Sequence, residues 1–213
     1  MATTDEWRLR LWDWQDTVRR WARAPTNDAV MRVSIFFDIR ALYGDAGLAS
    51  RLQAVMLEQT GRNTIFQAAL AANALASRPP LGVFRRFVVD RDGEHRDSLD
   101  IKKRGVLPVT EIARLHALAR GIEAVNTQER LSALAKAGHM TIVDSRNLVD
   151  ALHFLQRVRM QHQCEQILAG TPVDNYINPR TLPRLAKEQL RDAFTIIDEA
   201  QAAVRQTYRA GMG

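Results

Sequence analysis

Cysteine is almost absent from this chain, since Cys164 is the one cysteine among 213 residues. A single thiol excludes an internal disulfide and a metal cluster built from several thiolates. Long hydrophobic runs are missing too, and no stretch approaches the roughly 20 apolar residues that a membrane-spanning helix needs. The opening "MATTDEWRLR" lacks the basic-then-apolar order of a signal peptide. We therefore predict a protein of a reducing compartment, the cytoplasm, with no membrane segment.

The motifs of several enzyme classes are also missing. Neither of the glycine-rich phosphate-binding fingerprints occurs, there is no H-E-x-x-H, and the five histidines are far apart in the sequence. Asp90 and Asp92 form a D-x-D pair, which in nucleotidyltransferases holds two metal ions. Here the pair belongs to "DRDG", which is typical of a tight turn. We predict no catalytic residue and no metal ligand in this chain.

The net charge of +6 raises the question of nucleic-acid binding. Between positions 85 and 104, however, seven basic side chains are interleaved with five acidic ones. Such mixing is typical of a solvated surface rather than of a cationic stripe. The charge pattern therefore does not favour a nucleic-acid partner.

Apolar residues recur at steps of three and four through most of the chain, which indicates helices. Trp7, Leu11, Trp14, Val18 and Trp21 would share one face, either as core or as a seam to a neighbouring domain. We predict a single all-α domain over residues 1–213, a bundle of about eight helices. The helices are expected near 7–21, 28–44, 46–61, 64–76, 108–121, 127–138, 141–168 and 190–208. Alternating β-branched residues and the "DRDG" turn predict one short β-hairpin, about 83–101.

Polar side chains interrupt two apolar faces. Arg159 continues the buried stripe of the long helix, and His162 and Gln163 follow on or near the same face. Such groups need partners. Either they form a buried polar network, with Asp150 or a carboxylate of another helix, or they line a groove for a ligand or a domain. Asp38 and Arg40 of "FFDIR" lie close to core residues and need each other or a neighbour.

The segment "DIKKRG" joins the predicted hairpin to the helix that starts near Pro108. If it continues as a strand, Lys102 and Lys103 point in opposite directions. Our hypothesis is that Lys102 faces a groove beside Arg159 and His162 and meets a nucleotide phosphate or an acidic protein substrate. Lys103 would then be solvated.

Taken together, several segments resemble one protein family. They are "SIFFDIRALYGD", "DIKKRGVLPVTEIARLHALARGI", "NTQERLSAL", "LVDALHFLQRVRMQHQ" and "NYINPRTLPRLAKEQLRDAF". The chain, over about residues 6–210, is similar to the putative nucleotidyltransferase substrate-binding domain. In that family this is the C-terminal helical module of bacterial proteins that also carry a cyclic-nucleotide-binding-like domain, paired CBS domains and a nucleotidyltransferase domain. The transferase part is similar to the uridylyltransferase that modifies the PII signalling protein.

The resemblance implies a non-catalytic substrate-binding domain of a signal-transduction enzyme, acting with a separate catalytic domain in cis or in trans. No cofactor would belong to this chain, and a nucleotide with Mg²⁺ would be held mainly by the partner. A protein substrate is a further candidate partner. The alternatives are a helical interaction or regulatory module without a ligand pocket, and a stand-alone binder of nucleotides or nucleic acid. With His162 added from the helical face, the candidate substrate-binding residues are Asp38, Arg40, Asp100, Lys102, Arg114, Asn126, Arg130, Arg159, His162 and Gln163.

Overall fold

Helices make up most of the molecule, which confirms the predicted fold class. The computed structural model describes residues 4–208, so both ends of the predicted domain lie outside the described residues. No helix among them is both long and apolar enough to cross a membrane. The eight α-helices of the described range are α1 (Leu11–Arg23), α2 (Asn27–Phe36), α3 (Gly47–Gly61), α4 (Thr64–Ala76), α5 (Leu107–Arg120), α6 (Thr127–Lys136), α7 (Ile142–Leu168) and α8 (Arg184–Thr207).

Several helix ends follow from side-chain capping. The Asn126 side chain accepts hydrogen bonds from the first amides of α6, and Thr141 does the same for α7. These bonds satisfy amides that have no partner within the helix. Pro108 lies in the first turn of α5, and Gly121 ends that helix in the left-handed conformation, with a φ of 70°.

α2 ends earlier than predicted. The apolar pattern extends it to Gly44, but the helix stops at Phe36, and residues 37–46 are irregular before α3. Asp38 lies in this irregular segment, where its carboxylate contacts Arg114 and Arg130. We attribute the early end of α2 to this contact, because the ion pairs hold Asp38 against α5 and α6.

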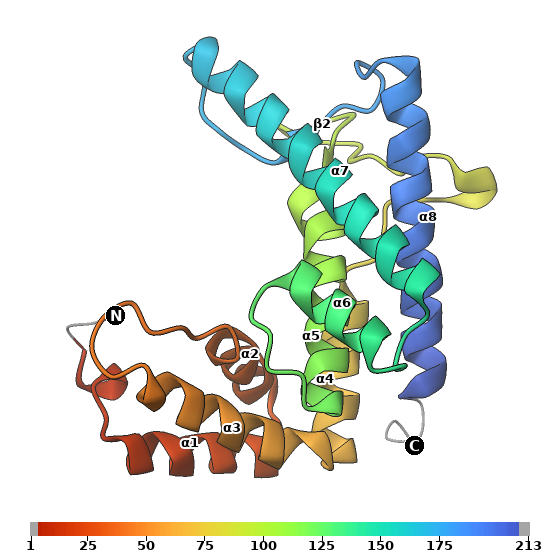
Figure 1. Cartoon of the computed structure of the whole chain (residues 1–213). Helices are drawn as coiled ribbons and strands as arrows, with labels where there is room; N and C mark the ends of the chain where they lie inside the picture. Colours follow the sequence, from red (N-terminus) through yellow and green to blue (C-terminus); the bar gives the residue numbers. More distant parts are fainter. Residues whose placement is uncertain (1–3, 209–213) are drawn as a thin grey trace.

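The core has two parts that meet at α5. One part joins α1–α4 with the end of α8, and the other joins α6, α7 and most of α8. In Figure 1, α1–α3 lie together to one side of the lower bundle, while α7 and α8 extend away from them. Ile112 and Leu115 of α5 face the first part, and Val109 and Ala113 face the second. α5 is therefore buried around most of its circumference.

The tryptophans at the start of the chain pack on the first part of the core. Trp7, Trp14 and Trp21 surround Phe36, with ring centroids 5.3, 4.6 and 5.7 Å from its ring. Aromatic rings at such separations contribute beyond the area that they bury. Within the stripe Val18 is buried as core, whereas Trp7, Trp14 and Trp21 are half-buried and line a cavity of about 540 Å³, so the choice between core and domain seam stays open at the tryptophans.

The small sheet differs from the predicted hairpin in its pairing. The chain does reverse near the "DRDG" turn, where the amide of Asp97 donates to the carbonyl of Asp90. The two-residue strand β1 (Leu99–Asp100), however, pairs antiparallel with β2 (Tyr176–Ile177), which lies in the loop after α7. The prediction of two strands within 83–101 is therefore wrong about the partner. A strand this short needs the packed helices around it.

The segment "KKRGV" is helical rather than extended. Lys102–Val106 form a π-helical turn, η3, that leads directly into α5. The predicted strand alternation of Lys102 and Lys103 is therefore wrong, and both side chains are exposed. Gly105 lies where η3 meets α7 and α8, because a Cβ there would be 3.2 Å from Leu155 and Phe194 side-chain atoms.

We predict that Gly105→Ala lowers the free energy of unfolding by about 1–3 kcal/mol, because the added methyl group overpacks a closed contact. Urea denaturation measures this. Gly61→Ala is the matched control, since the nearest atom to its Cβ would be a carbonyl oxygen 3.9 Å away. That variant should be neutral, or more stable by up to about 1 kcal/mol. Equal stability of the two variants would contradict the close packing at Gly105.

Candidate functional site

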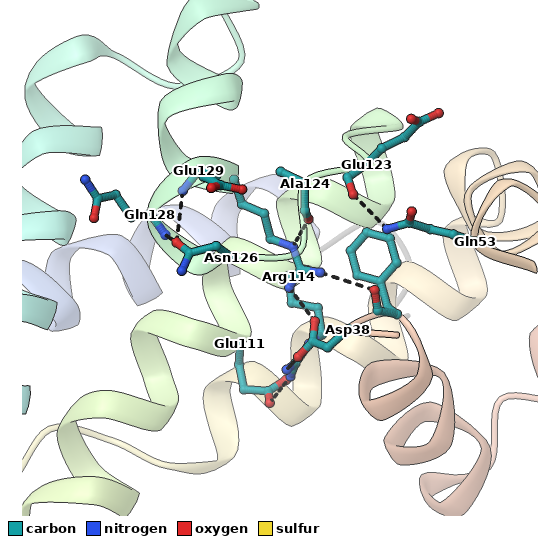
Figure 2. A network of polar contacts seen from close by, with 11 residues as sticks. Asp38, Gln53, Glu111, Arg114, Glu123, Ala124, Asn126, Gln128 and Glu129 are labelled. Atoms are coloured by element: carbon teal, nitrogen blue, oxygen red, sulfur yellow. Dashed lines mark hydrogen bonds and ion pairs between the residues drawn. The ribbon is translucent and has the colours of Figure 1, made fainter. Parts of the chain in front are cut away.

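Three of the predicted site residues meet in one buried ion network. Asp38 comes from the loop after α2 and Arg114 from α5 (Figure 2). Arg130 comes from α6. Glu111, one turn before Arg114 on α5, completes the set. We call these four residues the central network.

Arg130 is the most enclosed member, with 0% of its surface exposed. Its Nη1 is 2.7 Å from Oδ1 of Asp38, and its Nε donates to the carbonyl of Ala124 at 2.6 Å. The guanidinium also lies over the ring of Phe37, 4.3 Å from the centroid. A planar cation can make all three contacts at once, which a lysine cannot do.

The two arginines of the central network respond differently to burial. Burial lowers the pKa of Arg130, and the carboxylate of Asp38 opposes this only in part. Burial also acts to lower the pKa of Arg114, but the carboxylates of Glu111 and Asp38 outweigh it, so the pKa of Arg114 is raised. Both guanidinium groups remain charged, since even a lowered arginine pKa stays far above neutral pH. The network is thus two buried cations balanced by two carboxylates.

Two further predicted residues lie near this network without joining it. Asn126 caps α6, two residues after the Ala124 carbonyl that accepts from Arg130 (Figure 2). Arg40 is exposed and lines a shallow cavity with apolar residues of the α2–α3 loop and of α3. The suggested pairing of Asp38 with Arg40 is replaced by the pairs with Arg114 and Arg130.

The polar face at the end of α7 forms a second network with the loop that follows the helix. Arg159 Nε donates to Oδ1 of Asn175 at 2.6 Å, and Gln163 donates to the carbonyl of Asp174 at 3.1 Å. His162 Nε2 is 2.9 Å from Oδ1 of Asp174. The carboxylate partner is thus Asp174 of the loop, rather than Asp150 or a carboxylate of another helix. Of the two alternatives left open by the sequence, these contacts support the polar network.

Desolvation alone would raise the pKa of Asp174. The amide of Tyr176, which donates to its carboxylate, and the neighbouring His162 and Gln166 side chains outweigh that effect, so the pKa of Asp174 is lowered. The carboxylate therefore stays ionised while it holds the loop against α7.

Asp100 and Lys102 lie beside this second network. The amide of Ile101, between them, donates to the carbonyl of Asn175 at 3.0 Å. Asp100 Oδ1 accepts from the amide of Lys103 at 2.8 Å, which fixes the start of η3. We call this region, with β1, β2, η3 and the end of α7, the β1–β2 end. Figure 1 shows the last turns of α7 at the opposite side of the molecule from α1–α3.

The two groups differ in the chemistry that they can offer. Glu111, Arg114 and Arg130 of the central network are buried, Asp38 is 35% exposed, and the charges of the network contact one another. The β1–β2 end exposes the ammonium groups of Lys102 and Lys103, which can meet an anion. Within residues 4–208, no three or more His, Cys, Asp or Glu side chains are grouped as metal ligands would be.

Sequence reasoning missed the partners of both networks. Glu111 could have been found, because it lies three residues before Arg114 on a predicted helix and the two side chains therefore share a face. Asp174 and Asn175 lie in a loop with no periodic pattern. Nothing local in the sequence connects them with α7.

We predict that Arg130→Lys lowers the free energy of unfolding by about 2–4 kcal/mol, because an ammonium group cannot reach all the groups that the guanidinium contacts. Chemical denaturation provides the measurement. Arg146→Lys, on an exposed position of α7, should stay within about 0.5 kcal/mol of the unchanged protein. A tolerated Arg130→Lys would show that the fold does not depend on the geometry of the central network.

We also predict that Asp174→Ala frees the loop after α7. The amide of Tyr176 donates to Asp174 Oδ1 at 2.9 Å, so its hydrogen exchange should become roughly tenfold faster when this acceptor is removed. Asp150→Ala, on the exposed side of α7, should leave that exchange rate unchanged. Unaltered protection of Tyr176 in Asp174→Ala would contradict the anchoring role.

Comparison with protein families gives a match. A family model described as "Putative nucleotidyltransferase substrate binding domain" matches residues 64–208, more than half of the chain. The matched range begins with α4, so α1–α3, Asp38 and Arg40 precede it. Comparisons with curated proteins and with solved structures give no match.

Proposed function

Because the chain belongs to the family of putative nucleotidyltransferase substrate-binding domains, we propose that it is the non-catalytic substrate-binding part of a signal-transduction nucleotidyltransferase. The catalytic domain would lie on another module, in cis or in trans. CBS and cyclic-nucleotide-binding-like domains would be further partners, as in the bacterial proteins that the sequence resembles. The complex would act in the cytoplasm.

The observation that carries this proposal is the family match, which contains the whole β1–β2 end. At that end the exposed Lys102 and Lys103 begin a helix whose position is fixed by Asp100 and by the contact of Ile101 with Asn175. Lysine side chains on a fixed backbone suit recognition of phosphate or carboxylate groups. We therefore assign the substrate-facing surface to the β1–β2 end, with Lys102 as its first contact to a nucleotide phosphate. Mg²⁺ that accompanies the nucleotide would be bound mainly by the catalytic partner.

A second function is favoured by a separate observation. Arg114, Arg130 and Arg159 all contact acceptors of the same chain. The guanidinium groups are therefore used in contacts within the domain rather than in ligand binding. This is expected of a helical interaction or regulatory module without a ligand pocket. In that case the domain would dock on the neighbouring domains and regulate them through these contacts. It would not contact the nucleotide.

Calorimetric titration with ATP, UTP and cyclic AMP in the presence of Mg²⁺ separates the two functions. We predict measurable nucleotide affinity that Lys102→Ala weakens roughly tenfold, because a charge-assisted contact to phosphate is lost. Lys136→Ala, at the exposed end of α6, is the control and should bind like the unchanged protein. Neither variant should shift the melting temperature by more than about 2 °C.

Two results would contradict the assignment. Absence of binding for all three nucleotides would favour the interaction module. Equal affinities of Lys102→Ala and Lys136→Ala would move the nucleotide site away from the β1–β2 end.

A further inference from the structure

A cavity of about 350 Å³ lies between α5, the start of α7 and the second half of α8. It shares no lining residue with the central network or with the β1–β2 end. Its floor is apolar, with Ile112, Leu148 and Ile196, and its rim is polar. The volume falls in the range of cavities that hold small organic ligands, which commonly combine apolar walls with a few polar groups.

His116 gives this cavity a neutral polar group. Its Nδ1 is 3.2 Å from the hydroxyl of Tyr208, and Nε2 takes no part in that bond. Burial, together with the nearby Arg120 and His139, lowers the pKa of His116 to about 4. Burial also raises the pKa of Tyr208. At neutral pH the pair is therefore an uncharged imidazole bonded to a protonated phenol.

The charged side chains that line the cavity are acidic. Asp144 comes from the first turn of α7 and Glu199 from α8, and no lysine or arginine is among the lining residues. Asp144 Oδ2 accepts a hydrogen bond from the Thr141 hydroxyl at 2.6 Å, which holds it at the rim. The whole protein carries a net charge of +6, so this rim is opposite in sign to the molecule. Cations would be attracted to it and phosphates repelled.

We propose that this cavity binds a small primary amine with an apolar or aromatic body. The ammonium group lies between Asp144 and Glu199, and the body packs on Ile112, Leu148 and Ile196. The proposal is independent of the nucleotidyltransferase assignment, because it uses neither the exposed lysines nor a catalytic partner.

The test is a titration monitored by the imidazole NMR signals of His116 and His139 at pH 8, where histidines with ordinary pKa values are neutral. The probe is 2-phenylethylamine, with 2-phenylethanol and phenylacetate as neutral and anionic counterparts of similar shape. The expected result is saturable binding of the amine in the millimolar range, with both histidines perturbed. The alcohol should bind more weakly and phenylacetate not at all.

Three variants locate the site. Glu199→Gln should weaken amine binding roughly three- to fivefold, whereas Asp198→Asn, on the neighbouring exposed position of α8, should leave it unchanged. Ala203→Phe places a large side chain on an exposed lining position and should abolish binding of the amine. Equal binding of all three probes, no binding of the amine, or equal effects of Glu199→Gln and Asp198→Asn would overturn the proposal.

Discussion

The guanidinium of Arg130 has no exposed surface, so its charge must be balanced inside the protein. Asp38 supplies the counter-charge, the carbonyls of Ala124 and Phe37 accept hydrogen bonds from the guanidinium, and the ring of Phe37 lies against it. Removing one partner of such a buried pair leaves an uncompensated charge, which is far more costly than losing a surface ion pair. The positions of the α2–α3 loop, α5 and α6 relative to one another therefore depend on this pair and on Arg114 beside it.

The ion pairs of the central network also connect the residues before position 64 with residues 64–208, which the family model matches. Asp38 precedes the matched range, whereas Glu111, Arg114 and Arg130 lie within it. The central network thus links the α2–α3 loop to α5 and α6, which lie within the matched range. Residues that a motif comparison marks as candidate ligand groups can in this way be needed for the fold. Two surfaces outside the central network that we propose for ligands or partners are the exposed lysines of the β1–β2 end and the acidic-rimmed cavity between α5, α7 and α8.

Much of the fold could be predicted from sequence because helical periodicity and capping are local. The helices predicted to begin at residues 108, 127 and 141 begin within one residue of those positions. The errors have long-range causes. The apolar pattern continues past Phe36, but Asp38 is held by residues more than 70 positions away. Similarly, β1 pairs with a strand in the loop after α7, and no property of residues 83–101 specifies that partner.

The sequence indicated correctly that several candidate residues need hydrogen-bonding partners, but it did not identify which residues those partners are. Arg159, His162 and Gln163 on an apolar face indicated a polar network, and one exists. Its acceptors, Asp174 and Asn175, come from an irregular loop that only the folded chain brings to α7. The sequence also did not distinguish buried arginines from accessible ones, because burial depends on packing by distant segments. The ten candidates were therefore grouped together, although the fold divides most of them between two regions.

A double-mutant cycle between Asp38 and Arg130 tests the central claim most directly. Asp38→Asn, Arg130→Met and the double variant would be compared by urea denaturation. We expect a coupling energy of about 2 kcal/mol or more, with the double variant more stable than the sum of the single losses implies. Additivity within about 0.5 kcal/mol would contradict it, since the pair would then not hold the two regions together.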